Sequence, residues 1–182
     1  MSTKSLLCCV GSICVVGARL AIAAPAGSSK AITVTLNHVS PEGVGKSVGT
    51  ISIRPGKDGV VLIPNLKDLP PGEHGFHLHE SASCEAGLKD GKKSAAQAAG
   101  GHYDPGATKA HKGPEGGGHK GDLPKLVVAQ NGGVTQKMEV KGMALEDFHG
   151  KALMIHAGGD NYSDAPKPLG GGGDRIACGV VK

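Results

Sequence analysis

Aromatic residues are scarce in this sequence, which contains two phenylalanines, two tyrosines and no tryptophan. Proteins that hold single-stranded nucleic acid commonly stack its bases on aromatic side chains, so this composition argues against such a platform. A strong excess of one charge is missing as well, because 20 basic residues face 16 acidic ones. A dedicated polyanion-binding protein would carry blocks of positive charge. The composition therefore predicts no nucleic-acid partner.

Long hydrophobic runs are also missing. The apolar stretch of residues 6–16 is shorter than the roughly 20 residues that a membrane-spanning helix needs. Lys4 precedes this stretch and Ala21-Ile22-Ala23 follows it, which is the order of parts in an export signal. We predict that residues 1–23 are a signal peptide, rather than a membrane anchor, and that residues 24–182 are the mature domain. The protein is then exported, without stable membrane insertion.

Cysteine is sparse once the signal peptide is removed. Of five cysteines in the chain, only Cys84 and Cys178 remain in the mature domain. A single pair in an exported protein favours a disulfide over two buried free thiols. Closing the loop between Cys84 and Cys178 with a disulfide stabilises a fold by about 4–5 kcal/mol if chain entropy alone is counted.

Sustained helical periodicity is absent, and β-type alternation takes its place. Residues 31–37, for example, alternate Ile32, Val34 and Leu36 with polar residues, a pattern typical of a half-buried strand. Asn131-Gly132 between two apolar segments indicates a hairpin, and residues 145–148 are compatible with one helical turn. About eight short strands are predicted, near residues 31–37, 50–53, 60–63, 74–80, 126–128, 134–140, 152–156 and 176–181. Short strands with frequent turns predict an all-β closed sandwich or barrel.

Two long segments, residues 81–124 and 157–174, show neither periodicity. A structureless insertion of this length is unusual in a compact domain unless it is functional or cross-linked. The first segment contains Cys84, three histidines and several carboxylates. A bound metal ion is therefore the leading candidate for what fixes it.

Histidines are the residues that indicate the chemistry. His77 and His79 lie two residues apart on a predicted strand, so they share one face, while Leu78 points into the core. A lone histidine is more often structural than a metal ligand, but these two are joined by further histidines on the long segment. His111, His119 and Asp122 supply two nitrogens and one oxygen, which one more nitrogen would complete as a tetrahedral zinc site.

His77, His79 and His156 form a second set that contains only imidazoles. Such a set suits copper, because Cu(II) favours a tetragonal arrangement of nitrogen ligands. Each of the two sets is one ligand short. His102, which lies between His79 and His111 in the sequence, could donate one ring nitrogen to each metal.

Several motifs, in this order, resemble the copper,zinc superoxide dismutase family over nearly all of residues 30–182. They are residues 74–79, Gly100-Gly101-His102, residues 119–124 and Asp174-Arg175-Ile176-Ala177-Cys178-Gly179. Residues 167–173 and the export signal look like the bacterial periplasmic branch, so the resemblance implies a periplasmic location. It also implies an eight-stranded Greek-key β-barrel, or sandwich, with two long functional loops.

The resemblance also implies a role for individual residues. One copper ion per chain would be held by His77, His79, His102 and His156, and one zinc ion by His102, His111, His119 and Asp122. The pair Cys84 and Cys178 matches the family's disulfide. Asp160 matches an aspartate that hydrogen-bonds one ligand of each metal, here His77 and His111. His74 matches a structural histidine, whereas His38 and His149 match no functional position.

The activity that the resemblance implies is the dismutation of superoxide to dioxygen and hydrogen peroxide. Copper would cycle between two oxidation states while zinc maintains the geometry; Arg175 would meet the anion, and His102 would carry a proton. The alternative is a periplasmic copper/zinc-binding protein without this activity, which would not need Arg175 or a bridging His102. Lys92 and Lys93 are candidates for steering the substrate. Either a monomer or a homodimer is compatible with the sequence.

Overall fold

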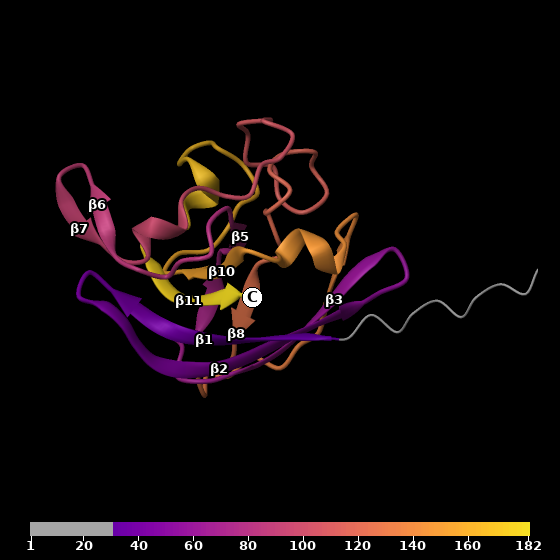
Figure 1. Ribbon diagram of the computed structural model, residues 1–182, viewed down its shortest axis with the longest axis horizontal. Helices are drawn as coiled ribbons and strands as arrows, with labels where there is room; N and C mark the ends of the chain where they lie inside the picture. The colour runs from indigo at the N-terminus through magenta and orange to yellow at the C-terminus, as the bar shows by residue number, and fades with distance from the viewer. Residues whose placement is uncertain (1–30) are drawn as a thin grey trace, which may run out of the picture.

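The computed structural model describes residues 31–182, so the predicted signal peptide, residues 1–23, lies outside the described residues. This part of the chain is all-β, with short 3-10 turns (Figure 1). The strands are β1 (Ile32–Ser40), β2 (Gly43–Pro55), β3 (Gly59–Leu66), β4 (Gly72–His74), β5 (Phe76–His79), β6 (Gly87–Lys89), β7 (Lys92–Ser94), β8 (Leu126–Val128), β9 (Met138–Lys141), β10 (Lys151–His156) and β11 (Arg175–Val181). The 3-10 helices are η1 (Gln97–Ala99), η2 (Leu145–Phe148) and η3 (Leu169–Gly171), and η2 confirms the predicted turn.

The main sheet is antiparallel and curls on itself, with the strand order β5-β10-β11-β1-β2-β3-β9. β4 continues β5 across Gly75, whose N–H donates to Gly158 O and whose carbonyl accepts from His156 N. Because β4 pairs with β8, the order extends to eight strands when β4 and β5 are counted as one. The predicted Greek-key β-barrel is confirmed. β6 and β7 form a separate hairpin that projects from the barrel (Figure 1).

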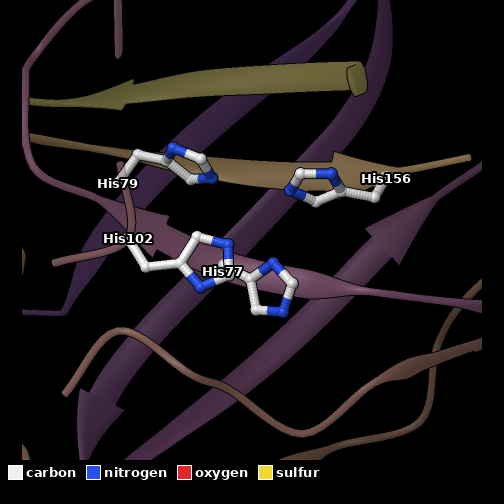
Figure 2. Close-up of side chains that lie close together, drawn as sticks. All are labelled: His77, His79, His102 and His156. Atoms are coloured by element: carbon white, nitrogen blue, oxygen red, sulfur yellow. The ribbon is translucent and has the colours of Figure 1, made fainter. Parts of the chain in front are cut away.

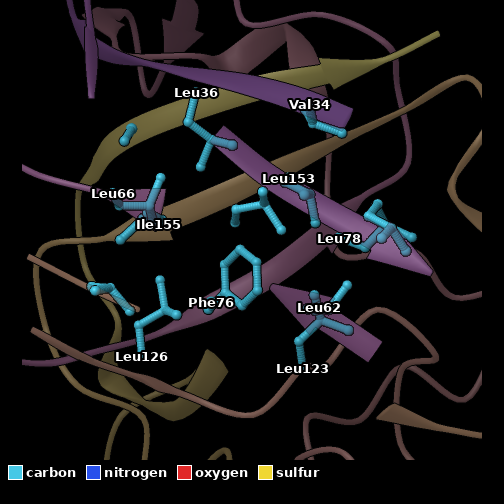
Figure 3. Packing of buried hydrophobic residues seen from close by; sticks show 14 of the residues in the cluster. Val34, Leu36, Leu62, Leu66, Phe76, Leu78, Leu123, Leu126, Leu153 and Ile155 are labelled. Carbon is cyan, nitrogen blue, oxygen red and sulfur yellow. The ribbon is translucent and has the colours of Figure 1, made fainter. Parts of the chain in front are cut away.

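The alternation in the sequence corresponds to the core. On β1, Val34 and Leu36 are buried while Thr33 and Thr35 are exposed, because successive side chains of a strand point to opposite faces. The same rule buries alternate residues of β2 and β3. Phe76 and Leu78 of β5 complete this apolar interior, which Figure 3 shows at close range. The face of β5 that carries His77 and His79 therefore points away from the core.

The predicted hairpin around Asn131 and Gly132 is wrong in its pairing. A tight turn does form there, with Gly132 at φ +79° and its N–H donated to Ala129 O. However, β8 pairs with β4, and β9 pairs with β3. The Asn-Gly pair determines only the local reversal of the chain. Pairing is decided by which neighbouring strand buries the apolar residues on either side.

Both long segments predicted to lack periodicity are loops over the same end of the barrel (Figure 1). The β5–β8 loop, residues 80–125, contains the β6–β7 hairpin and η1, and the β10–β11 loop, residues 157–174, contains η3. The predicted disulfide is confirmed, because Cys84 of the first loop is bonded to Cys178 of β11. Among residues 31–182, no helix has the length and apolar character needed to cross a bilayer.

Candidate metal centre

Two neighbouring strands carry three of the predicted ligands. His77 and His79 lie on β5, and His156 ends β10, its pairing partner. His102 approaches from the β5–β8 loop and forms an isolated bridge with His79. All four side chains are buried, and Figure 2 shows their rings around a common point. We call His77, His79, His102 and His156 the four-histidine cluster.

Hydrogen bonds determine which nitrogen of each strand-borne ring faces the cluster. In each ring one N–H donates to a fixed oxygen, which leaves the lone pair of the other nitrogen free. The donated bonds run from His77 Nε2 to Asp160 Oδ2 (2.8 Å), from His79 Nδ1 to Gly100 O (3.0 Å) and from His156 Nδ1 to Gly173 O (3.1 Å). The free atoms are therefore Nδ1 of His77 and Nε2 of His79 and His156.

These free nitrogens have no hydrogen-bond partner among residues 31–182. His77 Nδ1, His79 Nε2, His102 Nε2 and His156 Nε2 are all buried without a hydrogen bond. Possible ligand atoms of the four residues lie within 4.8 Å of one another. A buried, unpaired polar atom costs about 1–3 kcal/mol, so four at one point require an occupant. Four imidazole lone pairs are the donor set that copper favours, and the residues fit that metal.

Burial keeps the four-histidine cluster neutral. It lowers the pKa of His102 to about 4 and that of His156, with help from the nearby His77, to about 3. The pKa values of His77 and His79 are lowered for the same reason. Neutral imidazole is the form that binds a metal. The cluster is thus ready for a metal at neutral pH without first losing protons.

A second group of donors surrounds Asp122. Its Oδ1 lies 2.9 Å from His102 Nδ1, 3.0 Å from His111 Nδ1 and 3.3 Å from His119 Nδ1. We call His102, His111, His119 and Asp122 the Asp122 cluster. Three nitrogens and one carboxylate match the donor set and number of a closed zinc site. His102 belongs to both clusters, with Nδ1 on this side and the unpartnered Nε2 on the other.

His77 also brings a possible ligand atom within 4.8 Å of His102, His111 and Asp122. Its Nε2–H is donated to Asp160, however, and its Nδ1 faces the four-histidine cluster. Neither nitrogen is free for a second metal. His119 is therefore the remaining nitrogen donor of the Asp122 cluster, although its side chain is slightly exposed.

Carboxylates dominate the electrostatics of the Asp122 cluster. Burial alone would lower the pKa of His111, but hydrogen bonds and charge from Asp122 and Asp160 outweigh it and raise the pKa to about 9. In return, hydrogen bonds from His111 and a second histidine hold the pKa of each aspartate far below its usual range, despite burial. Without a metal, His111 is thus protonated at neutral pH.

Asp160 connects the two clusters. Its Oδ2 accepts from His77 Nε2, and its Oδ1 accepts from His111 Nε2 at 2.7 Å. The backbone N–H of Tyr162 also donates to Oδ1, which fixes the carboxylate. One side chain of the β10–β11 loop thus orients one histidine from each cluster, the geometry expected of a residue that tunes metal ligands from behind.

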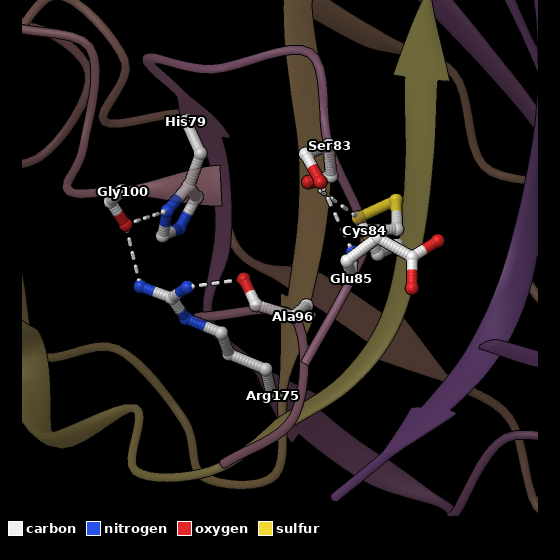
Figure 4. The surroundings of a disulfide bond; sticks show 8 residues. His79, Ser83, Cys84, Glu85, Ala96, Gly100 and Arg175 are labelled. Atoms are coloured by element: carbon white, nitrogen blue, oxygen red, sulfur yellow. Dashed lines mark hydrogen bonds between the residues drawn. A yellow bond between two sulfur atoms is a disulfide. The ribbon is translucent and has the colours of Figure 1, made fainter. Parts of the chain in front are cut away.

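Arg175 lies beside the four-histidine cluster, opposite His156 in the β10–β11 pairing. Its Nη1 and Nη2 donate to Ala96 O and Gly100 O, each at 2.6 Å (Figure 4). Gly100 O also accepts from His79 Nδ1, so the guanidinium and one ring of the cluster share an acceptor. The side chain is held in one orientation and remains partly exposed.

The other singled-out residues lie outside both clusters. Both ring nitrogens of His74 face carbonyl oxygens, those of His156 and Pro70, which is a structural role. His149 is exposed and bonds Lys182 O, and His38 lies on β1. Lys92 and Lys93 are exposed on the projecting β6–β7 hairpin.

Sequence reasoning missed the backbone acceptors Ala96 O, Gly100 O and Gly173 O. Glycine-rich motifs next to His102 and Arg175 are the only signal that could have indicated two of them. Ala96 carries no signal, since its left-handed φ of 49° is set by the folded loop.

Comparisons with known proteins agree with this geometry. Residues 47–181 match the family model described as copper/zinc superoxide dismutase. Superoxide dismutase [Cu-Zn] of Escherichia coli K12 is 51% identical over 172 residues, which cover 94% of this chain and 98% of the relative. The solved structure of Cu/Zn superoxide dismutase from Brucella abortus is 49% identical, with a TM-score of 0.82, and the match covers 84% of this chain and all of that one.

A second solved structure, the monomeric copper, zinc superoxide dismutase from Salmonella enterica, is 53% identical with a TM-score of 0.74. This match covers 84% of this chain and 100% of that one. Both clusters fit the two metals in the family's name. The chain therefore belongs to the copper/zinc superoxide dismutase family.

Proposed function

We propose that this chain converts two superoxide anions and two protons into dioxygen and hydrogen peroxide, with copper in the four-histidine cluster and zinc in the Asp122 cluster. The observation that carries the proposal is the convergence of four buried, unpartnered imidazole nitrogens beside a fixed guanidinium. When bound, copper supplies the one-electron chemistry that oxidises one superoxide and reduces the next. Zinc has no redox chemistry and suits the structural role.

The residues divide the work by position. His77, His79 and His156 hold copper through nitrogens whose direction is set by the bonds on their opposite sides. His111, His119 and Asp122 hold zinc, and His102 contributes to both metals through its two nitrogens. Asp160 keeps one ligand of each metal in orientation.

Arg175 binds and orients the substrate anion. A guanidinium presents donors in a planar fork, and two of its nitrogens are already engaged by Ala96 O and Gly100 O. The group is therefore fixed before the substrate arrives, so little reorganisation is needed when charge changes during the reaction.

His102 Nε2 is placed to hold and deliver a proton. It faces the four-histidine cluster without a hydrogen-bond partner, while Nδ1 on the other side of the ring lies at Asp122, so Nε2 can carry a proton whenever it does not bind copper. A ring that stays anchored through one nitrogen can take up and release a proton at the other. Hydrogen peroxide forms only when the reduced anion takes up protons. His102 Nε2 is a buried general acid and base suited to that transfer.

We further propose that residues 1–23 direct export and that residues 24–182 act in the periplasm, as a monomer or a homodimer. Bacterial relatives over nearly the whole chain support this location, and so does the disulfide, since such bonds persist in oxidising compartments. The mass of the protein released from the periplasm measures the cleavage site. A protein that keeps residues 1–23 would contradict the proposal.

The test of the activity is to measure copper and zinc stoichiometry together with superoxide consumption on the purified domain. We expect one copper and one zinc per chain and turnover that requires copper. A fully loaded protein that consumes no superoxide would instead support the alternative, a copper/zinc-binding protein without dismutase activity. Protein loaded with zinc alone is the matched control and should be inactive.

A further inference from the structure

His111 is the ligand of the Asp122 cluster whose support is least obvious. It lies on the β5–β8 loop, in a stretch without helix or strand, yet its side chain is fully buried. No strand pairing fixes its backbone. Its N–H donates to Asp164 Oδ2 at 2.8 Å, a contact with the other long loop.

Asp164 uses its second oxygen within its own loop. Oδ1 accepts from the backbone N–H of Leu169 at 3.0 Å. This bond fixes the start of a turn in which Leu169 and Gly170 both have positive φ, at 53° and 69°. One exposed carboxylate thus ties the backbone of a zinc ligand to the turn that follows in the β10–β11 loop.

That turn lies directly against the ring of His111. A Cβ on Gly170 would come within 2.0 Å of Asp160 Oδ1 and 2.9 Å of His111 Nε2, so only glycine leaves room for the hydrogen bond between these two atoms. Gly170 is held further by its N–H to Ser163 O. The β10–β11 loop therefore hydrogen-bonds His111 at two places: Asp160 bonds its ring, and Asp164 bonds its backbone N–H.

We propose that Asp164 is a positioning residue for His111 and slows the release of zinc from the Asp122 cluster. The inference rests on the proposed assignment of His111 to zinc. Asp164 belongs to neither cluster; it acts by keeping the His111 backbone and the Leu169–Gly170 turn in register. Without it, His111 can swing away with its loop, and the ring loses the close cover of Gly170.

The β5–β8 loop offers a matched control. Asp104 is also an exposed aspartate with two accepted bonds, from Lys109 N at 2.8 Å and from Thr108 Oγ1 at 3.0 Å. Both partners of Asp104 lie within its own loop, and neither is a ligand. Its substitution removes one bond from a backbone N–H and one from a hydroxyl, and it removes no bond to His111.

The experiment compares Asp164→Asn and Asp164→Ala with Asp104→Asn in protein loaded with copper and zinc. Zinc transfer to a chelator should be about tenfold faster in Asp164→Ala, the effect of one charge-assisted hydrogen bond, and Asp164→Asn should lie between it and wild type because one acceptor oxygen remains. Asp104→Asn should match wild type. With Co(II) in place of zinc, the visible spectrum should shift in Asp164→Ala and stay unchanged in Asp104→Asn.

The outcomes distinguish a wrong assignment of the zinc site from a wrong positioning role of Asp164. If His111→Ala keeps its zinc, the assignment of His111 is wrong, and the proposed zinc site fails with it. If His111→Ala loses zinc but Asp164→Ala releases it at the rate of Asp104→Asn, the positioning role alone is overturned. A general structural role would lower the Tm of metal-free Asp164→Ala and leave the Co(II) spectrum unchanged, which also contradicts the proposal.

Discussion

The four-histidine cluster is carried mainly by paired strands, whereas the Asp122 cluster is carried by a loop. His77, His79 and His156 lie on β5 and β10, whose backbone pairing places them without any metal. His111 depends on side-chain bonds that cross between the two loops, whereas His119 and Asp122 contact each other within the β5–β8 loop. The strand-borne half is therefore preorganised by the barrel, and the loop-borne half is organised by its own carboxylates.

The two halves also differ in their protonation at neutral pH. Burial lowers the pKa of His156 to about 3, so this ring is neutral at pH 7. The carboxylates of Asp122 and Asp160 raise the pKa of His111 to about 9, so a metal at this site must first displace a proton. Copper would thus enter a neutral, rigid site, and zinc would replace a proton in a charged, more adaptable one.

Removing a strand-borne ligand should have the largest effect on activity. In His156→Ala we expect superoxide turnover to fall by about a thousandfold or more, since loss of an outer partner of a ligand already costs about 10–100-fold. Zinc content should stay near wild type, because His156 does not belong to the Asp122 cluster. Metal analysis and superoxide consumption on one sample measure both. Full copper with wild-type turnover would remove His156 from the copper site.

Cys84→Ser tests how the loop-borne half depends on the barrel. The disulfide closes a separation of 94 residues, so its loss should lower the free energy of unfolding by about 4–5 kcal/mol in the chain-entropy description. Activity should also fall, because the same loop presents Ala96 O and Gly100 O to Arg175. Denaturant unfolding measures the first effect. Unchanged stability and activity with both metals bound would contradict the role of the disulfide.

Arg175→Ala isolates the proposed substrate-binding residue, which binds no metal. Copper and zinc should remain near wild type, while turnover should fall by roughly 10–100-fold, the effect of losing one charge contact of about 1.5–3 kcal/mol. Arg175→Lys should recover part of the activity, since the charge remains but the planar fork does not.

Turnover at two ionic strengths sharpens this test. Charge steering makes the wild-type rate fall with salt, and Arg175→Ala should flatten that dependence. Wild-type rate and salt slope in the variant would exclude Arg175 from the mechanism.

The free energy of unfolding of the metal-free domain should depend on pH in opposite directions for the two groups of histidines. The pKa values of His102 and His156 are lowered from 6.5 to about 4 and about 3, so the unfolded chain binds more protons and stability is lost as pH falls below 6.5. Each group contributes a slope of up to about 1.4 kcal/mol per pH unit. The raised pKa of His111 acts in the opposite direction, and its contribution is lost between pH 6.5 and about 9.

These two groups of histidines should give a stability maximum near pH 6.5, measured by denaturant unfolding across the pH range. His111→Asn removes the titrating ring and should reduce the loss above that pH while leaving the loss below it. A variant with the wild-type profile on the alkaline side would show that His111 does not hold a proton in the folded, metal-free state.

The strand-borne half was largely predictable from the sequence. Alternation located β1 and β5, a short apolar run located β10, and the spacing of His77 and His79 placed both rings on one face, because a strand has a fixed two-residue repeat. The count of eight barrel strands also follows from such patterns once β4 and β5 are joined at Gly75. Local periodicity carries this information.

The loop-borne half was predictable only as a list of ligands. Asp164 and Ala96 act through contacts over 53 and 79 residues of sequence, and no local pattern encodes such a contact. The prediction that β8 pairs with β9 was wrong for a related reason. The Asn-Gly turn is a local signal, but the choice of partner strand depends on the assembled barrel.

The most direct test of the two-metal account is the metal content and superoxide turnover of His79→Ala beside His119→Ala, both loaded with copper and zinc. His79→Ala should keep zinc, lose copper and be inactive. His119→Ala should keep copper and measurable turnover, while its zinc is lost and the domain unfolds more easily. Loss of the same metal from both variants, or an inactive His119→Ala with full copper, would contradict the division into a copper cluster on strands and a zinc cluster on a loop.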